Sequence, residues 1–72
     1  MNWTLLKGGN WRGKSECATV RIDCYRGVGL WQWRAIGIGH SERIRRRTFD
    51  CNGFDSADQA KLFSEAIVKI ME

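Results

Sequence analysis

One stretch of this 72-residue chain has the apolar periodicity of an amphipathic helix, and it lies near the C-terminus, over residues 56–71. Apolar side chains recur there at helical spacing, at Ala60, Phe63, Ala66, Ile67 and Ile70. Ser56 and Gln59 stand at the spacing of a capping box, which favours a helix start at this point. A single helix covers only one face of a sheet, so any sheet in this chain keeps one face open to solvent or to a partner.

Short strands are predicted ahead of that helix. Residues 17–25 alternate strictly between apolar and polar, and the apolar face consists of Ala18, Val20, Ile22 and Cys24. Residues 30–38 form a second strand, whose register stays open because both of its faces carry apolar side chains. Residues 43–49 form a third strand, and its arginines place it at a sheet edge or on a solvated face.

We expect one α+β domain over residues 1–72. Residues 17–49 supply a three- to four-stranded antiparallel sheet, because hairpin connections join neighbouring short strands, and residues 56–71 supply the C-terminal helix that packs on it. Residues 1–16 form an N-terminal segment with a basic loop and at most a short edge strand at its start. A core of this size is marginal, so a homodimer that pairs edge strands or buries tryptophans is one alternative.

Positive charge is concentrated in the first three quarters of the chain. Residues 1–54 hold ten Lys or Arg against four Asp or Glu, whereas residues 55–72 hold two against four. Most of these cations are arginines, whose planar guanidinium suits phosphate groups and guanine edges. The distribution favours a polyanionic partner, and charge kept for solubility alone is the competing interpretation.

The candidate contacts with nucleic acid or another partner are one tryptophan and nine cations: Trp11, Arg12, Lys14, Arg21, Arg26, Arg34, Arg43, Arg45, Arg46 and Arg47. Trp11 belongs to the set because an indole beside Arg12 and Lys14, in a loop next to glycine, is hard to bury and can stack on a base. Trp31 and Trp33 point the same way on a strand, and they either close the core or contact a partner. A solvated face that binds nothing is the alternative for the arginines.

The other chemistry-bearing residues give little support for catalysis or metal binding. Cys17, Cys24 and Cys51 form an odd set without a secretory signal pattern, so we expect buried, reduced thiols in a cytoplasmic protein. Together with His40 they match no usual zinc spacing. A lone histidine without paired carboxylates is poor material for acid–base catalysis, and no apolar run is long enough to span a bilayer. We therefore expect no catalytic residues, no metal, no cofactor and no membrane segment.

Three short motifs follow one another in the chain: Tyr25–Val28 (YRGV), Trp33–Ala35 (WRA) and Gly53–Ala60 (GFDSADQA). In this order they resemble the three-stranded-sheet-plus-helix DNA-binding domain of plant ethylene-response transcription factors, whose relatives include the arm-binding domains of tyrosine integrases and domains of phage homing endonucleases. The resemblance implies that the sheet grips the major groove while the helix packs behind it. Arg26 and Arg34 would then contact DNA, and Trp33 would be a contact or a core residue. Gly37 and the extra residues Cys51–Asn52 depart from the family pattern.

The sequence therefore favours a small non-enzymatic module that binds nucleic acid, duplex DNA above all, through the exposed basic face of its sheet. The alternative from another class is an accessory protein of a phage or mobile element. Such a protein would bind and inhibit an acidic or nucleic-acid-binding host protein, for example a nucleic-acid-guided defence complex of the CRISPR kind. It would use the same arginines, because guanidinium groups bind carboxylates and phosphates alike.

Overall fold

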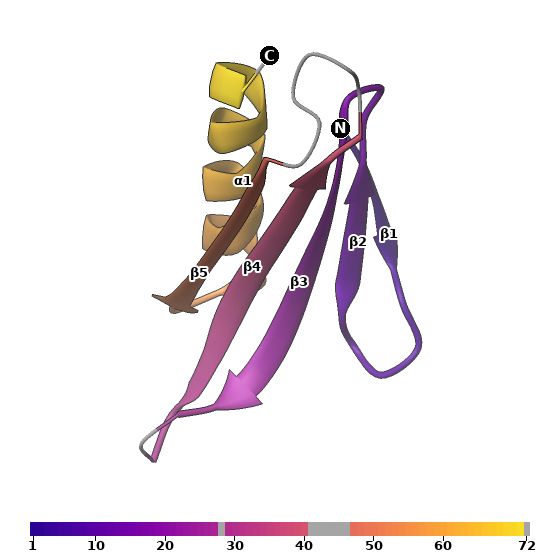
Figure 1. The fold of residues 1–72 in the computed structure, drawn as a ribbon. Helices are drawn as coiled ribbons and strands as arrows, with labels where there is room; N and C mark the ends of the chain where they lie inside the picture. The colour runs from indigo at the N-terminus through magenta and orange to yellow at the C-terminus, as the bar shows by residue number, and fades with distance from the viewer. Residues whose placement is uncertain (28, 41–46, 72) are drawn as a thin grey trace.

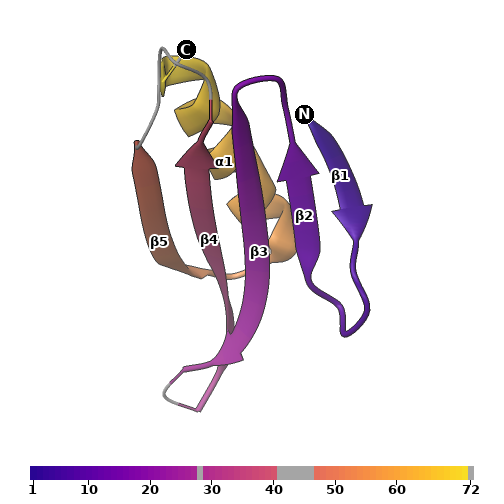
Figure 2. The ribbon, with the colours of Figure 1, turned by 45° about the vertical axis from the view of Figure 1, so that its right-hand side comes forward.

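The structure is a computed structural model that describes residues 1–27, 29–40 and 47–71. Within these residues the chain forms five strands and one helix, in the order β1 (Asn2–Leu5), β2 (Trp11–Lys14), β3 (Ala18–Arg26), β4 (Trp31–Gly39), β5 (Thr48–Phe54) and α1 (Ala57–Met71) (Figure 1). The strands pair antiparallel in sequence order, and α1 packs on one face of the sheet, against β3, β4 and β5 (Figure 2). The expected α+β fold is confirmed, with five strands where three or four were expected.

The helix α1 starts where the capping pattern predicts. The Ser56 hydroxyl accepts a hydrogen bond from the Gln59 backbone N–H at 3.2 Å. The Gln59 side chain in turn accepts one from the Asp55 N–H at 3.1 Å. These contacts satisfy amide donors at the helix N-terminus that have no partner inside the helix. Asp58 in the first turn and Lys69 in the last turn also suit the helix dipole.

The buried side of α1 is rotated from the stripe that the sequence predicts. Ala60, Ser64 and Val68 are buried, with at most 3% exposure. The prediction is wrong for Ala66, which is exposed, and for Ile70, which is 79% exposed. Ser64 can occupy a buried position because its hydroxyl donates to the Ala60 C=O at 2.7 Å, so burial leaves its polar group satisfied.

The register between β3 and β4 places large side chains opposite small ones on the helix side of the sheet. Ile22 lies opposite Ala35, and both are fully buried. Val20, also fully buried, lies opposite Gly37. The small residues of β4 let α1 approach the sheet closely, which settles the register that the sequence left open. Trp33 therefore lies on the helix side, half-buried against the core.

The third predicted strand, residues 43–49, coincides with β5 at its last two residues, where β5 begins. Arg47 precedes β5, and residues 43–46 lie outside the described residues. Two phenylalanines explain the position of β5. The rings of Phe49 and Phe54 lie 6.2 Å and 5.2 Å from the ring of Phe63 on α1, measured between centroids. The position of the strand is therefore set by aromatic side chains that pack against the helix. Arginine side chains do not need such packing, so the arginine run does not determine where the strand forms.

A β-bulge interrupts the pairing of β4 with β5. Trp33 pairs with Phe54 and Ala35 with Cys51, so two residues of β5, at positions 52 and 53, face Arg34 alone. The second of them is a glycine with a φ of 87°, a conformation that residues with a β-carbon rarely adopt. The extra residue breaks the alternation along β5, so this strand has no period-two pattern in the sequence.

Residues 11–14 form strand β2, so the prediction of a basic loop there is wrong, whereas the short edge strand expected near the N-terminus is present as β1. Gly13 stands in the middle of β2 because Trp3 covers it. A β-carbon at position 13 would lie 2.6 Å from both Met1 Sδ and Trp3 Cζ3. The glycine that suggested a loop is instead a packing site for an indole.

A lysine of α1 joins the first hairpin to the helix. Lys61 Nζ lies 3.2 Å from the centroid of the Trp11 ring and 5.8 Å from that of Trp3. Trp3 Nε1 donates a hydrogen bond to Glu65 Oε1 at 2.6 Å. We call Trp3, Trp11, Lys61 and Glu65 the indole clamp. Since β1 and β2 lie beside the strands that α1 covers, the clamp holds this hairpin against the helix by cation–π contact and hydrogen bonding.

The three cysteines lie on the helix side of the fold or at its edge, and none of them is fully buried. Cys24 belongs to β3 and Cys51 to β5, while Cys17 directly precedes β3. Each side chain is of intermediate exposure. The prediction of buried thiols is therefore wrong, because a small sheet covered by a single helix leaves its margins partly open to solvent.

Candidate nucleic-acid interface

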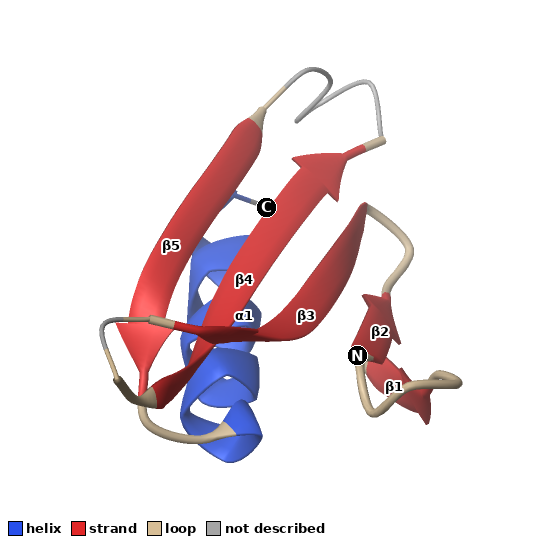
Figure 3. Cartoon of the chain, turned by 90° about the horizontal axis from the view of Figure 1, so that it is seen from below, coloured by secondary structure: helices blue, strands red, loops and turns tan. Residues whose placement is uncertain are grey.

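Figure 3 shows α1 on one face of the sheet, and the strand pairing places most polar residues of β2 to β5 on the other face. By strand pairing it presents, from β2 to β5, Arg12, Lys14, Thr19, Arg21, Asp23, Tyr25, Gln32, Arg34, Ile36, Ile38, Thr48 and Asp50. We call this surface the open face. Within the part of the chain that the structure describes, no second helix covers it.

Three cations gather on β2 and β3 within the open face. Arg12 lies directly opposite Arg21, and Lys14, opposite Thr19, is a diagonal neighbour of Arg21. Opposed residues have Cβ atoms about 4.5–5.5 Å apart, and diagonal ones about 7–8 Å. Arg12, Lys14 and Arg21 are all exposed, and we call them the cationic cluster. Like charges placed opposite each other destabilise a sheet. A bound anion would neutralise these cations and relieve their repulsion, so the arrangement favours anion binding.

Two arginines of the open face bind carboxylates of this chain. Arg21 Nε donates to Asp23 Oδ1 at 2.8 Å, and the Arg21 side chain stays 62% exposed. Arg34 donates twice to Asp50, from Nε at 2.8 Å and from Nη2. These hydrogen bonds hold the pKa of the Asp50 carboxyl below its ordinary value and raise the pKa of Arg34. Arg34 is thus engaged within the chain more fully than Arg21.

The Asp50→Asn variant is expected to lose less stability in acid than the wild type. Because the pKa of Asp50 is lower in the folded than in the unfolded chain, its ion pair stabilises the fold above the unfolded-state pKa of about 3.9. This contribution is lost as the pH falls through the lower, folded-state pKa. Urea midpoints of the two proteins should differ at neutral pH and converge in strong acid. A difference that stays constant with pH would contradict the ion pair.

The remaining predicted contacts are dispersed over the molecule. Trp11 faces the helix within the indole clamp, so it is not part of the open face. Arg26 lies on the helix side of β3, opposite Trp31. Arg47 is exposed just before β5, where its C=O accepts a hydrogen bond from the Gly39 N–H at 2.8 Å. The other predicted contacts, Arg43, Arg45 and Arg46, lie outside the described residues.

One exposed surface goes beyond the set of predicted contacts: the end of the β3–β4 hairpin, where the sequence left Trp31 open between the core and a contact with a partner. Leu30 is 68% exposed and Trp31 is 67% exposed. On the opposite side of the same hairpin, the Tyr25 hydroxyl donates to Gln32 Oε1 at 3.0 Å. The sequence did not reveal this surface, because the nine-residue strands β3 and β4 extend past neighbours of four and seven residues, and the four-residue β2 was predicted as a loop.

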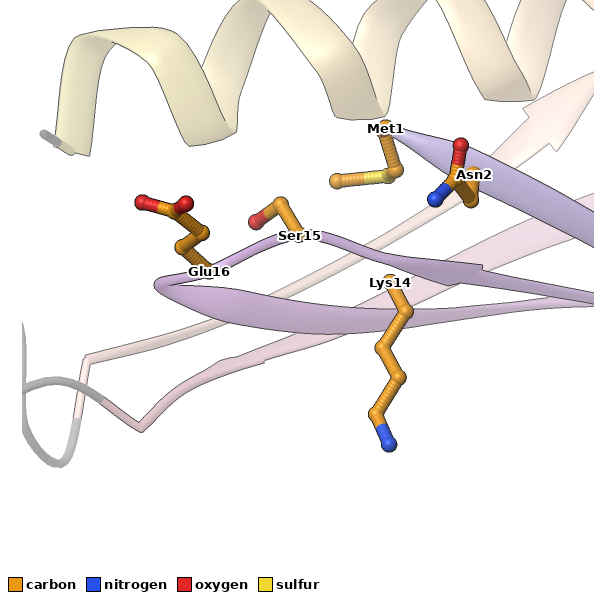
Figure 4. Close-up of a pocket in the computed structure, with 5 residues that line it drawn as sticks. All are labelled: Met1, Asn2, Lys14, Ser15 and Glu16. Carbon is orange, nitrogen blue, oxygen red and sulfur yellow. The ribbon is translucent and has the colours of Figure 1, made fainter.

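A shallow depression of about 550 Å³ lies between the start of the chain and the β2–β3 turn, lined by Met1, Asn2, Lys14, Ser15 and Glu16. Figure 4 shows that the Lys14 side chain points away from the other four, toward the open face. The Ser15 hydroxyl is occupied with its own turn, where it accepts from the Ala18 N–H at 3.1 Å and lies 3.3 Å from the Ala18 C=O. Among these lining residues, the depression therefore does not place a nucleophile beside a base, as a catalytic site would require. Lys14 belongs to the cationic cluster.

Comparisons with known proteins found no relative of this chain. The chain matches no protein-family model, no curated protein and no solved structure. Among residues 1–27, 29–40 and 47–71, no three side chains of His, Cys, Asp or Glu lie close enough together to hold a metal ion. No helix within the same residues has the length and apolar character that a membrane crossing requires. Any assignment of function rests on the surfaces of the fold itself.

Proposed function

We propose that the protein binds nucleic acid through the open face of its sheet and catalyses no reaction. The observation that supports this proposal is the cationic cluster, in which Arg12 and Arg21 are directly opposed and Lys14 is their neighbour. Exposed cations at this spacing bind adjacent phosphates through charge-assisted hydrogen bonds. Arg34, on the same face, becomes a further phosphate site wherever a phosphate displaces the carboxylate of Asp50.

The width of the sheet determines how a duplex can be contacted. Five strands spaced by about 4.8 Å make a sheet roughly 19 Å wide, which exceeds the ~12 Å width of the major groove of B-DNA. The open face as a whole therefore lies across a phosphate backbone, and contacts of that kind depend little on base sequence. Among the described strands, the β3–β4 hairpin is narrow enough to enter a groove where it extends past β2 and β5.

Affinity for a short duplex is expected to fall with salt along a log–log slope of about −2.7, because each cation of the cluster releases about 0.9 counterion. Fluorescence anisotropy of a labelled duplex between about 50 and 200 mM salt measures this slope. Arg12→Gln should make the slope shallower by about 0.9 and weaken binding to all sequences alike.

Two further variants make this test specific to the open face. Lys69→Gln removes one charge from the exposed side of α1 and should leave the slope unchanged. Asp50→Asn releases Arg34 from its carboxylate and should make the slope steeper by up to about 0.9. No binding at about 50 mM salt, or equal losses for Arg12→Gln and Lys69→Gln, would exclude the open face as a nucleic-acid surface.

A second candidate function is binding, and thereby inhibition, of an acidic host protein or nucleoprotein complex. The observation that favours it is the Arg34–Asp50 pair, in which this face already binds a carboxylate through two hydrogen bonds. Competition separates the two candidates. Polyglutamate should displace a labelled duplex as well as unlabelled DNA does, at equal charge concentration, if carboxylates are the natural partner. Under the nucleic-acid proposal it should compete far less well.

A further inference from the structure

The β3–β4 hairpin ends in a two-stranded ribbon that no other described strand supports. The pairing of β2 with β3 ends at Ile22, and the pairing of β4 with β5 ends at Trp33. Beyond these positions only β3 and β4 pair with each other, and Figure 1 shows the ribbon projecting past the N-terminal end of α1. The last rung of the ribbon places Arg26 directly opposite Trp31, so their side chains share one side.

Two large apolar side chains stand exposed at the end of this ribbon. Trp31 is 67% exposed and the adjacent Leu30 is 68% exposed. Within the described residues, the Trp31 indole takes part in no aromatic pair and no cation–π contact, unlike the indoles of Trp3 and Trp11. Exposed large apolar side chains at the tip of a projecting element are typical of a binding site.

The charge around this tip indicates the chemistry of its ligand. Arg26 is exposed and makes no ion pair with a described carboxylate. The nearest acid on β3, Asp23, points to the open face and is bound to Arg21. An open indole beside an unpaired guanidinium matches a nucleobase joined to its phosphate, because the base stacks on the ring while the cation takes the charge.

We propose that Trp31 stacks on an unpaired base, so that the protein prefers single-stranded nucleic acid over the duplex DNA that the sequence favours. In a duplex the faces of the bases are already covered by their neighbours, and only their edges are accessible in the grooves. An indole face can therefore stack only on a base that has left the duplex. This inference rests on the proposed function, since the cationic cluster supplies the phosphate contacts that bring a strand to the tip.

The distance between the cluster and the tip sets a lower limit on the length of a strand that contacts both. Arg21 and Arg26 lie five residues apart on β3, about 17 Å at the rise of an extended strand. Arg21 faces the open face, whereas Arg26 and Trp31 face the helix side, so a strand that reaches both sites passes around the edge of the ribbon and spans more than this distance. Oligonucleotides shorter than this span are expected to reach only one of the two sites and to bind more weakly.

Trp31→Ala is expected to weaken binding of a short oligothymidylate about tenfold while leaving affinity for a matched duplex unchanged. For each ligand, Trp31→Ala should show the same log–log slope of affinity against salt as the wild type, because stacking releases no counterion. Anisotropy at constant salt measures both affinities. Oligothymidylate should also quench part of the tryptophan fluorescence of the wild type, and Trp31→Ala should abolish that part of the quenching.

Matched variants keep this test free of folding effects. Trp31→Phe retains an aromatic face and should keep most of the single-strand preference. Leu62→Ala, at a residue of α1 that is also 68% exposed, should alter neither affinity. A wild type that binds duplex as tightly as single strand, or a Trp31→Ala substitution that weakens binding of both ligands equally or of neither, would overturn the inference. The dependence of duplex affinity on salt concentration tests the role of the open face independently of these outcomes.

Discussion

Replacing Gly37 with valine is expected to lower the free energy of unfolding by about 3 kcal/mol. Gly37 is buried on the helix side of β4, opposite Phe49 of β5, and a β-carbon built on it overlaps the Phe49 ring. The ring has little freedom to move, because it packs edge-on against Phe63 of α1 with 6.2 Å between centroids. A valine would therefore force β5 or α1 away from β4.

Urea unfolding monitored by circular dichroism measures this loss, which is a large part of the roughly 4–11 kcal/mol expected for a domain of this length. The double variant Gly37→Val/Phe49→Ala should be less destabilised than the two single losses added together, since removing the ring makes room for valine. Ile38→Ala, at the adjacent, 53% exposed residue on the open face, is the control and should cost less than about 1 kcal/mol. A Gly37→Val variant as stable as the wild type would show that the ring does not rest on the glycine.

Trp11→Ala should also lower the free energy of unfolding by about 3 kcal/mol, and it should weaken nucleic-acid binding as well. The Trp11 ring packs against the core and lies 3.2 Å below Lys61 Nζ. Its loss releases the β1–β2 hairpin from α1. Because β2 carries Arg12 and Lys14, two of the three cations of the cluster lose their fixed position on the open face.

Lys61→Met is the matched control for the indole clamp. Methionine keeps an apolar side chain of similar length over the two indoles, so the variant should lose the cation–π contribution of about 1 kcal/mol and the weak surface ion pair of Lys61 Nζ with Asp58 Oδ1 at 4.0 Å. Duplex affinity, measured at a temperature where both variants are folded, should fall for Trp11→Ala and stay near wild type for Lys61→Met. Unchanged duplex affinity in a folded Trp11→Ala variant would show that the clamp does not position the cationic cluster.

The parts of the fold with regular patterns could be predicted from the sequence. Strict alternation located β3, and capping residues located the start of α1, because each pattern reflects one buried face. Within α1 the buried side was misjudged, since Ser64 is buried and Ile70 is exposed. A polar residue that bonds to the preceding turn can occupy the core, and hydrophobic spacing alone does not reveal it.

Strands β2 and β5 show why the rest of the fold could not be predicted from the sequence. Gly13 in β2 suggests a turn in the sequence, yet it is a strand residue that makes room for Trp3. In β5 the bulge at residues 52–53 removes the alternation that identifies a strand, and the departure noted at Cys51–Asn52 falls at this bulge. Both features depend on contacts between residues far apart in the chain, which local patterns do not contain.

For the candidate site, the sequence predicted the residue types but not their grouping. The excess of arginine before the helix indicated an anion-binding surface, and Arg12, Lys14 and Arg21 do share the open face. The sequence did not show that Asp50 would bind Arg34, because that contact requires the register of β5. Nor did it show that Trp31 would lie where β3 and β4 extend past their neighbours, since this depends on where β2 and β5 stop.

The order of strands in this sheet has a consequence for how the chain folds. Every strand pairs with its neighbour in sequence, so each pairing closes a short loop at small entropic cost, and contact order within the sheet is low. The chain also has no proline, which removes the slow isomerisation that delays many small domains. A sheet of this kind can reassemble hairpin by hairpin in rapid steps, leaving the docking of α1 as the main long-range event.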